Sequence, residues 1–306
     1  RMKITRNSWG YYTLALFTTF LWGSAFAGAK IGFEYMPPMM LSGIRFTLAG
    51  LILVPMILFS RLNWREQIAQ NWRFMLLFGF VQSFLQYGLF YMGLNLVPGA
   101  ISAIIIGAGP LFIAVMAHFS LKNDKLTPRK IFAIMLGMAG VISISLTGSE
   151  LATSDKFYWG VALLILSNLI GSYTNIMVVK RKGEVSSMLL TMASNLSGGL
   201  MLFLTSLFIE PTEALHQALP LEFYVAIIWL AIIPAAGFSI WYYLLALPGV
   251  KVSELNILKF TIPIIGVVLS WLLLPNEYPT WGTVLGIAII SAAVLVLQLP
   301  AIWKSK

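Results

Sequence analysis

The sequence predicts an all-α integral membrane protein with ten transmembrane helices, and composition, apolar runs and loop charges all indicate it. The 306 residues are 59% hydrophobic and only 10% charged, with a mean hydropathy of +0.86. Soluble proteins carry about a quarter charged residues. The formal charge of +9 is spread over short loops. We therefore attribute it to the bias of cytoplasmic loops and expect no nucleic-acid partner.

Apolar runs of about membrane-spanning length follow one another, and several breaks between them carry turn residues such as Pro248-Gly249. The first run lacks a convincing small-residue cleavage site, so we expect a retained helix rather than a signal peptide. The ten predicted segments are residues 11–31, 38–59, 74–94, 99–119, 130–146, 157–178, 186–208, 221–247, 252–274 and 280–299.

Loop charges alternate along the chain. Sixteen of the twenty lysines and arginines fall in the two termini and the even-numbered loops, whereas Lys156 is the one basic residue in the odd-numbered loops. The odd-numbered loops carry carboxylates instead, among them Glu34 and Glu210. The positive-inside rule therefore predicts an inner-membrane protein with both termini in the cytoplasm.

The chain also resembles itself at an offset close to 150 residues. Leu21-Trp22-Gly23-Ser24 is similar to Leu169-Ile170-Gly171-Ser172, 148 positions later, and Pro98-Gly99 recurs as Pro248-Gly249, 150 positions later. We therefore divide the chain into two repeats, residues 11–147 and 157–299. Each repeat holds an odd number of spans, so the second must enter the membrane upside down. Inverted repeats with a site at their interface are typical of secondary transporters.

Lys259 is the main indicator of function. It lies eight residues into the ninth segment, about 10–12 Å along a helix, where an ammonium costs a few kcal/mol unless water, a partner or a ligand meets it. Pro263 removes the helical partner of the Lys259 carbonyl, and Asn256 shares the stretch. We interpret the stretch as half of a binding site. The alternatives are a lysine that reaches the headgroups or pairs with Glu254, although five residues is a poor spacing for that pair.

Other polar and aromatic residues within the spans share helix faces. Gln82 and Gln86 are four residues apart and Phe90 continues their stripe, whereas Asn168, Ser172 and Asn175 form a polar face of the sixth segment. The structural alternatives are hydrogen bonds between helices, tight packing on small residues and an interfacial aromatic belt. The candidate substrate-binding set is Trp22, Ser24, Gln82, Gln86, Phe90, Asn168, Ser172, Asn175, Trp241, Tyr242, Asn256 and Lys259.

The deep ionised residues, Arg45 and Lys259, are both cations, and the middle of each predicted span lacks Asp and Glu. A site with Lys259 therefore favours a carboxylate, a phosphate or another electron-rich ligand. For Arg45 we expect a structural role, with helix carbonyls or Glu34 meeting its charge.

The sequence argues against an enzyme. It has no cysteine and two histidines, His118 and His216, which fall on predicted opposite sides of the membrane. We expect no metal site and no cofactor. A Gly-rich loop ending in Gly-Lys-Ser/Thr is also absent from the sequence, so ATP is not the obvious energy source.

Leu21-Trp22-Gly23-Ser24, Met36-Pro37-Pro38 and Ile44-Arg45-Phe46 resemble the drug/metabolite transporter superfamily, and more narrowly its ten-helix exporters built from two EamA-type repeats. Lys259-Phe260-Thr261-Ile262-Pro263 fits the same pattern. The resemblance covers essentially the whole chain. It implies a basket of helices around a central cavity, with bacterial aromatic-amino-acid exporters and organelle sugar-phosphate exchangers among its members. The residues it places nearest the cavity are Trp22, Gln86, Ser172, Asn175, Trp241 and Lys259.

One motif departs from a branch of this superfamily. Small multidrug exporters carry an essential Glu in their first helix, and the first predicted helix here has none. We therefore expect an exporter of small metabolites, with amino acids first, that works by alternating access. An exchanger of organic anions or phosphorylated metabolites and a passive channel are the alternatives. We expect membrane lipid and the substrate as partners, and a monomer with a homodimer as the alternative. The expected hinges are Pro98, Gly99, Pro110, Pro248, Gly249 and Pro263.

A reporter scan across the loops tests the predicted topology. An alkaline phosphatase domain fused after Lys182 is expected to be inactive, because the sixth loop is predicted to face the cytoplasm. A matched fusion after Glu210, in a carboxylate-bearing loop, is expected to be active. Activity outside the cell after Lys182 would refute the topology.

Overall fold

The computed structural model describes residues 9–94, 96, 105–146, 156–273 and 279–303, which form a helical bundle without a β-strand in those ranges. Several described helices are long and apolar enough to cross a membrane. Two shorter apolar helices span Ile105–Ser120 and Trp281–Val296. The five spans that meet the length and hydropathy requirements are Pro38–Leu58, Trp64–Leu94, Phe157–Lys180, Ser187–Ile209 and Leu221–Ala246.

The first half of the chain contains α1 (Trp9–Tyr35), α2 (Pro38–Leu58), α3 (Trp64–Gly79), the π-helix η1 (Phe80–Gln86), α4 (Tyr87–Leu94), α6 (Gly109–Ser120) and α7 (Pro128–Leu146). The second half contains α8 (Phe157–Lys180), α9 (Ser187–Ile209), the 3₁₀ turn η2 (Glu213–His216), α10 (Leu221–Ala246), α11 (Val252–Ile257), the 3₁₀ turn η3 (Leu258–Phe260), α12 (Thr261–Leu273) and α13 (Trp281–Trp303).

The third predicted segment began too late, at Phe74. The helix starts at Trp64, directly after Asn63. Its first two turns carry polar side chains such as Arg65 and Glu66, so a search for apolar runs does not include them. Polar turns of this kind extend a spanning helix into the aqueous region, so hydropathy alone places the helix start too late.

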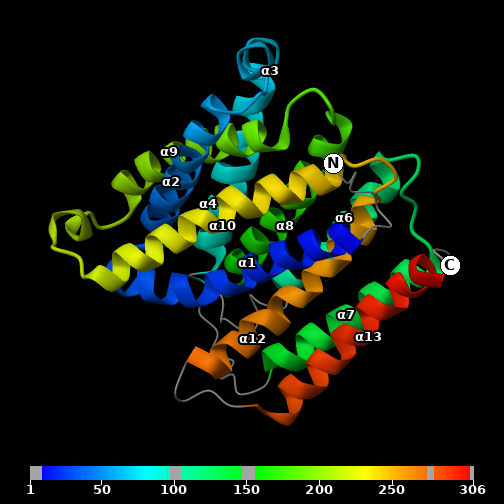
Figure 1. Cartoon of the computed structure of the whole chain (residues 1–306). Coiled ribbons are helices and arrows are strands. Elements are labelled where there is room, and N and C mark those ends of the chain that lie inside the picture. The colour runs from blue at the N-terminus through cyan, green and yellow to red at the C-terminus, as the bar shows by residue number, and fades with distance from the viewer. Residues whose placement is uncertain (1–8, 95, 97–104, 147–155, 274–278, 304–306) are drawn as a thin grey trace.

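The described ends of the chain lie on one side of the bundle (Figure 1). The start of α1 and the end of α13 are on the right, with the connections from α6 to α7 and from α10 to α11. The turn between α1 and α2 and the segment around η2 lie on the opposite side. The bundle therefore has two distinct ends, and the loops fall into two groups.

Helices α2 and α9 pack closely and run antiparallel. A Cβ added at Gly43 would lie 2.5 Å from the Phe203 nitrogen, and one at Gly199 would lie 2.5 Å from the Thr47 nitrogen. Since residue numbers rise on one helix as they fall on the other, the directions oppose. Small residues let two backbones approach this closely, as is common in membrane helix pairs.

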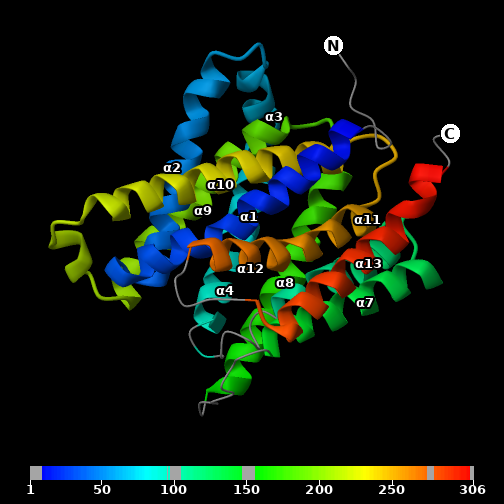
Figure 2. The same cartoon turned by 60° about the horizontal axis from the view of Figure 1, so that its bottom comes forward.

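Helices α7 and α13 form a second antiparallel pair, seen side by side in Figures 1 and 2. Ser143 donates to the Gly282 carbonyl at 2.9 Å, and the Arg129 Nε donates to the Val296 carbonyl at 2.6 Å. By contrast, α1 runs parallel to α12: Gly23 meets Ile265, and four residues earlier Thr19 meets Thr261, whose hydroxyl donates to it at 2.8 Å.

Gly199→Ala tests the α2–α9 contact. The added methyl meets backbone atoms that cannot move aside, so we expect the free energy of unfolding to fall by about 1–3 kcal/mol. Gly88→Ala is the matched control, because its Cβ would meet only Leu202, at 3.6 Å, and alanine favours a helix by up to about 1 kcal/mol. Melting temperatures in detergent measure both changes. Equal melting temperatures for the two variants would contradict the packing.

Candidate functional site

The Lys259 ammonium contacts two neighbouring indole rings. Its Nζ is 5.2 Å from the ring centroid of Trp22 on α1 and 4.8 Å from that of Trp241 on α10. The two indoles are themselves 5.0 Å apart and tilted by 57°. Such cation–π contacts favour a partly desolvated ammonium. Lys259 therefore sits where three elements, α1, α10 and η3, meet.

The Lys259 side chain makes no hydrogen bond or ion pair within the described part of the chain. The alternative pairing with Glu254 is not formed, and Glu254 instead meets Lys251 at 3.3 Å. The 3₁₀ turn η3 carries Lys259, and Pro263 lies in the first turn of α12. A 3₁₀ stretch inside a long helix often marks a hinge. The ammonium thus sits at a break in the helix, beside two aromatic rings.

Side-chain amides extend the site from Trp241. Its indole N–H donates to the Asn175 Oδ1 at 3.0 Å, and the Asn256 Nδ2 donates to the same oxygen at 3.4 Å. The Asn175 Nδ2 donates to the Gly171 carbonyl at 2.7 Å. The Oδ1 of Asn256 is buried without a hydrogen-bond partner. A buried acceptor left unmet costs free energy, so it is suited to a ligand donor.

Gln86 reaches the same place from η1. Its side-chain amide lies so close to Gly171 that a Cβ there would be 2.6 Å from the Gln86 Nε2. The Gln86 Oε1 is also buried without a partner, while Ser167 donates to the Gln86 backbone carbonyl at 2.8 Å. Gln82 is buried on the same π-helix. π-Helical turns occur frequently at functional sites, and this one places Gln86 against α8.

The structure does not bring all predicted residues into this cluster. Ser24 accepts a hydrogen bond from the Trp229 indole at 3.2 Å, in a separate contact between α1 and α10. The Asn168 amide donates to the Ile105 carbonyl at 2.5 Å, and the Ser172 hydroxyl donates within its own helix at 2.7 Å. Three polar groups of the candidate set are therefore occupied by contacts within or between helices.

Aromatic rings continue outward from Lys259. Phe238, absent from the predicted set, lies 5.8 Å from Trp22 and stacks on Tyr242 at 5.6 Å. Phe90 contacts Tyr87 and Tyr91 with ring centroids 6.1 and 5.0 Å away. Helical spacing indicated Phe90, whereas the fold shows that the ring of Phe238 packs against both Trp22 and Tyr242.

The partners predicted for Arg45 were wrong. Its guanidinium makes no hydrogen bond to helix carbonyls or to Glu34 within the described residues. It lies instead 4.7 Å from the Phe46 ring centroid, 5.9 Å from Tyr87 and 6.0 Å from Tyr91. The side chain turns toward the aromatic face of α4, a contact between helices that sequence spacing cannot reveal.

The predicted hinges occupy different kinds of break. Pro110 falls in the first turn of α6, directly after a break at Ala108, and Gly249 has a positive φ of 77° in the turn after Pro248. Glycine suits that backbone conformation, because side chains on other residues strain it. Pro98 and Gly99 lie outside the described residues.

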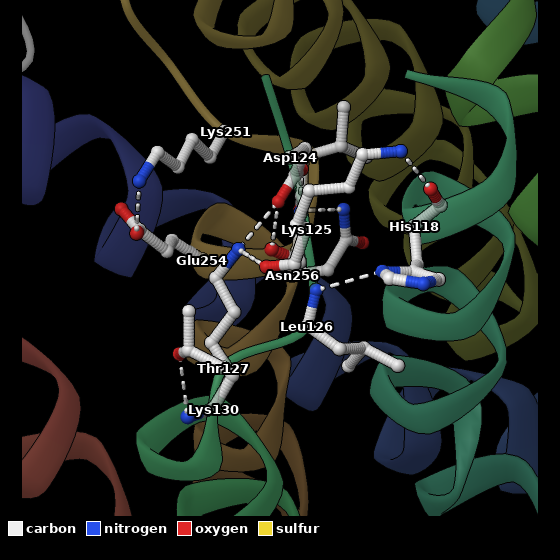
Figure 3. A network of polar contacts seen from close by, with 11 residues as sticks. His118, Asp124, Lys125, Leu126, Thr127, Lys130, Lys251, Glu254 and Asn256 are labelled. Atoms are coloured by element: carbon white, nitrogen blue, oxygen red, sulfur yellow. Dashed lines mark hydrogen bonds and ion pairs between the residues drawn. The ribbon is translucent and has the colours of Figure 1, made fainter. Parts of the chain in front are cut away.

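A second polar network joins the α6–α7 loop to the start of α11 (Figure 3). Asp124, 3% exposed, accepts from the Lys130 Nζ at 2.6 Å and from the Ser253 backbone N–H at 2.9 Å. It also bonds to the Ser253 hydroxyl. A carboxylate at a helix N-terminus is favourable. Sequence reasoning missed Asp124, although a lone acid in a strongly basic loop was a signal.

At the other end of the bundle, a groove of about 550 Å³ is lined by residues 33–38 and Leu94. It lies where α1 turns into α2. The buried Tyr91 packs behind it, because its ring meets that of Phe33 at 6.2 Å, edge to face. The Asp124 network ties the helices at the opposite end of the bundle.

Comparisons with known proteins agree with this architecture. The model of the EamA-like transporter family matches residues 9–146 and 158–299. A "probable amino-acid metabolite efflux pump" of Escherichia coli (strain K12) is 24% identical over 307 residues, covering 95% of each chain. An "uncharacterized transporter" of Bacillus subtilis (strain 168) is 24% identical, covering 93% of this chain and 90% of its own.

A protein of known crystal structure superposes with a TM-score of 0.78 and 19% identity, covering 98% of this chain and 100% of its own. That likeness concerns the fold alone. The chain is a multi-pass membrane protein with apolar helices. It belongs to the EamA-like transporter family.

Asp124→Asn tests the network at the α11 end. The substitution leaves Lys130, 3% exposed, as a buried charge without its counter-ion, so we expect the free energy of unfolding to fall by about 3–5 kcal/mol. Glu184→Gln is the control, because the Arg181–Glu184 pair is 51% and 43% exposed and such pairs contribute little. Thermal melting in detergent measures both. Similar melting temperatures for Asp124→Asn and Glu184→Gln would contradict a stabilising role.

Proposed function

We propose that this protein is a secondary transporter that exports a small carboxylate-bearing metabolite, with amino acids first, across the inner membrane by alternating access. One observation carries the proposal. The Lys259 ammonium contacts the rings of both Trp22 and Trp241 and has no anionic partner among the described residues. A substrate carboxylate would supply the missing charge.

The groups near Lys259 indicate which other chemical features the substrate has. The buried acceptors Asn256 Oδ1 and Gln86 Oε1 lack partners and would take N–H donors from a ligand. Trp22 and Trp241 offer flat apolar faces beside the ammonium. An anion, an N–H donor and an apolar body together describe an amino acid or a close analogue. The name of the Escherichia coli relative, an amino-acid metabolite efflux pump, agrees with this class.

The polar contacts at the start of α11 support alternating access. The Asp124 network holds the α6–α7 loop against Ser253 on α11, whereas the groove at residues 33–38 is open. Asn256 and Lys259 follow Ser253 on the continuous helical segment formed by α11 and η3. In the proposed cycle, Asp124 loses its hydrogen bonds to Ser253, the segment moves, and Lys259 becomes accessible from the α11 end of the bundle. Pro98, Gly99, Pro110, Pro248, Gly249 and Pro263 would be the bending points.

Helix directions support ten spans in two inverted repeats. Helices α2 and α9, the second spans of the two repeats, run antiparallel, as do α7 and α13, the fifth spans. Inversion requires this, because an odd number of spans reverses the second repeat. The shared side of the described chain ends agrees with an even number of crossings (Figure 1). With the basic loops on that side, the termini would be cytoplasmic.

Exchange of organic anions is the second candidate function. Two cations, Arg45 and Lys259, lie deep in the chain without carboxylate partners among the described residues. Such a pair suits ligands of greater negative charge. Counterflow in proteoliposomes also separates either carrier from a passive channel, because substrate on the far side accelerates only a carrier.

Uptake into proteoliposomes tests the role of Lys259. Lys259→Ala is expected to lower the transport of radiolabelled L-phenylalanine and other amino acids at least tenfold, because a charge-assisted hydrogen bond contributes about 1.5–3 kcal/mol. Lys259→Arg keeps the charge and is expected to alter the substrate preference. The exposed Lys182→Ala is the control. Unchanged rates and preferences in both Lys259 variants would rule out the proposed role.

A further inference from the structure

We propose that Arg45 forms a second anion-binding site, which receives the substrate's carboxylate between the groove at residues 33–38 and Lys259. This inference rests on the proposed function, because it assigns a second position to the same ligand class. It differs in its residues, since Arg45 belongs to α2 and Lys259 to η3.

Unmet hydrogen-bonding capacity is the first argument. Arg45 is only 9% exposed, and its Nε is buried without a partner. A guanidinium carries five N–H donors, and Arg45 uses none of them for a hydrogen bond to a described residue. Buried charges are normally paired, and burial without a partner is costly. The forked donors match the geometry of a carboxylate, which they bind through two parallel hydrogen bonds.

The surroundings of Arg45 favour a ligand over a lipid or a structural partner. Aromatic rings of Phe46, Tyr87 and Tyr91 surround the guanidinium within 4.7 to 6.0 Å. These rings attract the cation through their faces, and Arg45 forms no hydrogen bond with the hydroxyl of Tyr87 or Tyr91. The side chain is also too buried to extend along the surface to lipid headgroups.

The groove connects to Arg45 through two rings. Phe33 lines the groove and meets Tyr91 edge to face at 6.2 Å, and Tyr91 lies 6.0 Å from the guanidinium. Arg45 therefore lies two ring contacts inward from the groove, and a carboxylate would reach its guanidinium from the groove once the buried Tyr91 ring moves aside.

A continuous row of rings joins Arg45 to Lys259. Phe46 lies 4.7 Å from Tyr87 and 6.5 Å from Phe238, and Phe238 lies 5.8 Å from Trp22, which contacts Lys259. Phe46 and Phe238 are buried, so an apolar body would move along this row as the rings part, while its anionic group changes cation. Two sites of moderate affinity also let a ligand both enter and leave, which a single tight site would hinder.

Equilibrium dialysis of the purified full chain in detergent with radiolabelled benzoate tests the proposal, and benzyl alcohol serves as the uncharged analogue. The wild type is expected to bind about two benzoates per chain, Arg45→Gln one and Lys259→Gln one. Arg45→Lys is expected to bind at the Arg45 site about tenfold more weakly, since it loses the fork. Excess benzyl alcohol should leave benzoate bound.

Melting without ligand separates a binding role from a structural one. Arg45→Gln removes an unmet buried charge, so it is expected to melt no lower than the wild type. Binding of the same number of benzoates with the same affinity by Arg45→Gln and the wild type would overturn the proposal. The proposal would also be overturned if Arg45→Gln melted below the wild type and Arg45→Lys bound benzoate with full affinity. Those two results together would indicate a structural role for the charge.

The Lys259→Gln result keeps the two proposals apart. Loss of a benzoate in Arg45→Gln, with none lost in Lys259→Gln, would support the Arg45 site and contradict the central site. Loss of a benzoate in Lys259→Gln, with none lost in Arg45→Gln, would support the central site and contradict the Arg45 site. Loss of one benzoate in each single variant, and of both in the double variant, supports both.

Discussion

A half-buried ammonium without an anion among the described residues is the constraint on which the rest of this structure depends. Lys259 contacts two indole faces, and those contacts recover only part of the cost of removing the charge from water. Its position requires a break in a long helix, which η3 and Pro263 provide. An unfavourable free energy therefore remains at the point where α1, α10 and η3 meet, as expected of a site at which a bound ligand supplies the missing anion.

The same helix links this point to one end of the bundle. Ser253, Asn256 and Lys259 are spaced three residues apart along α11 and η3, and each meets a different partner: Asp124, Asn175 and the paired indoles. A change at the Asp124 network therefore acts on a segment that also carries the site. Small residues elsewhere, as at Gly43 and Gly199, fix α2 against α9. The bundle thus combines a tightly packed helix pair with a broken helix held by polar contacts.

Sequence reasoning predicted those features that depend on position along one helix. The depth of Lys259 and the polar face containing Asn175 follow from hydropathy and spacing, and the structure brings Lys259, Asn256, Asn175, Trp241, Trp22 and Gln86 together. Features that depend on neighbouring helices were missed or wrong. Arg45 turned toward aromatic rings rather than Glu34, and Asp124 reached Ser253 across 129 positions. The π-helix that aims Gln86 at Gly171 has no sequence pattern of its own.

The central claim is that Lys259 faces a pocket that water and substrate enter, and cysteine accessibility tests it most directly. The chain has no cysteine, so Lys259→Cys gives a single thiol. In proteoliposomes, a small anionic thiosulfonate reagent is expected to modify this thiol, and L-phenylalanine is expected to slow the reaction. Leu272→Cys, at a side chain 74% exposed on the apolar surface, is expected to remain unmodified in lipid. A Lys259→Cys thiol as unreactive as that of Leu272→Cys would contradict the account.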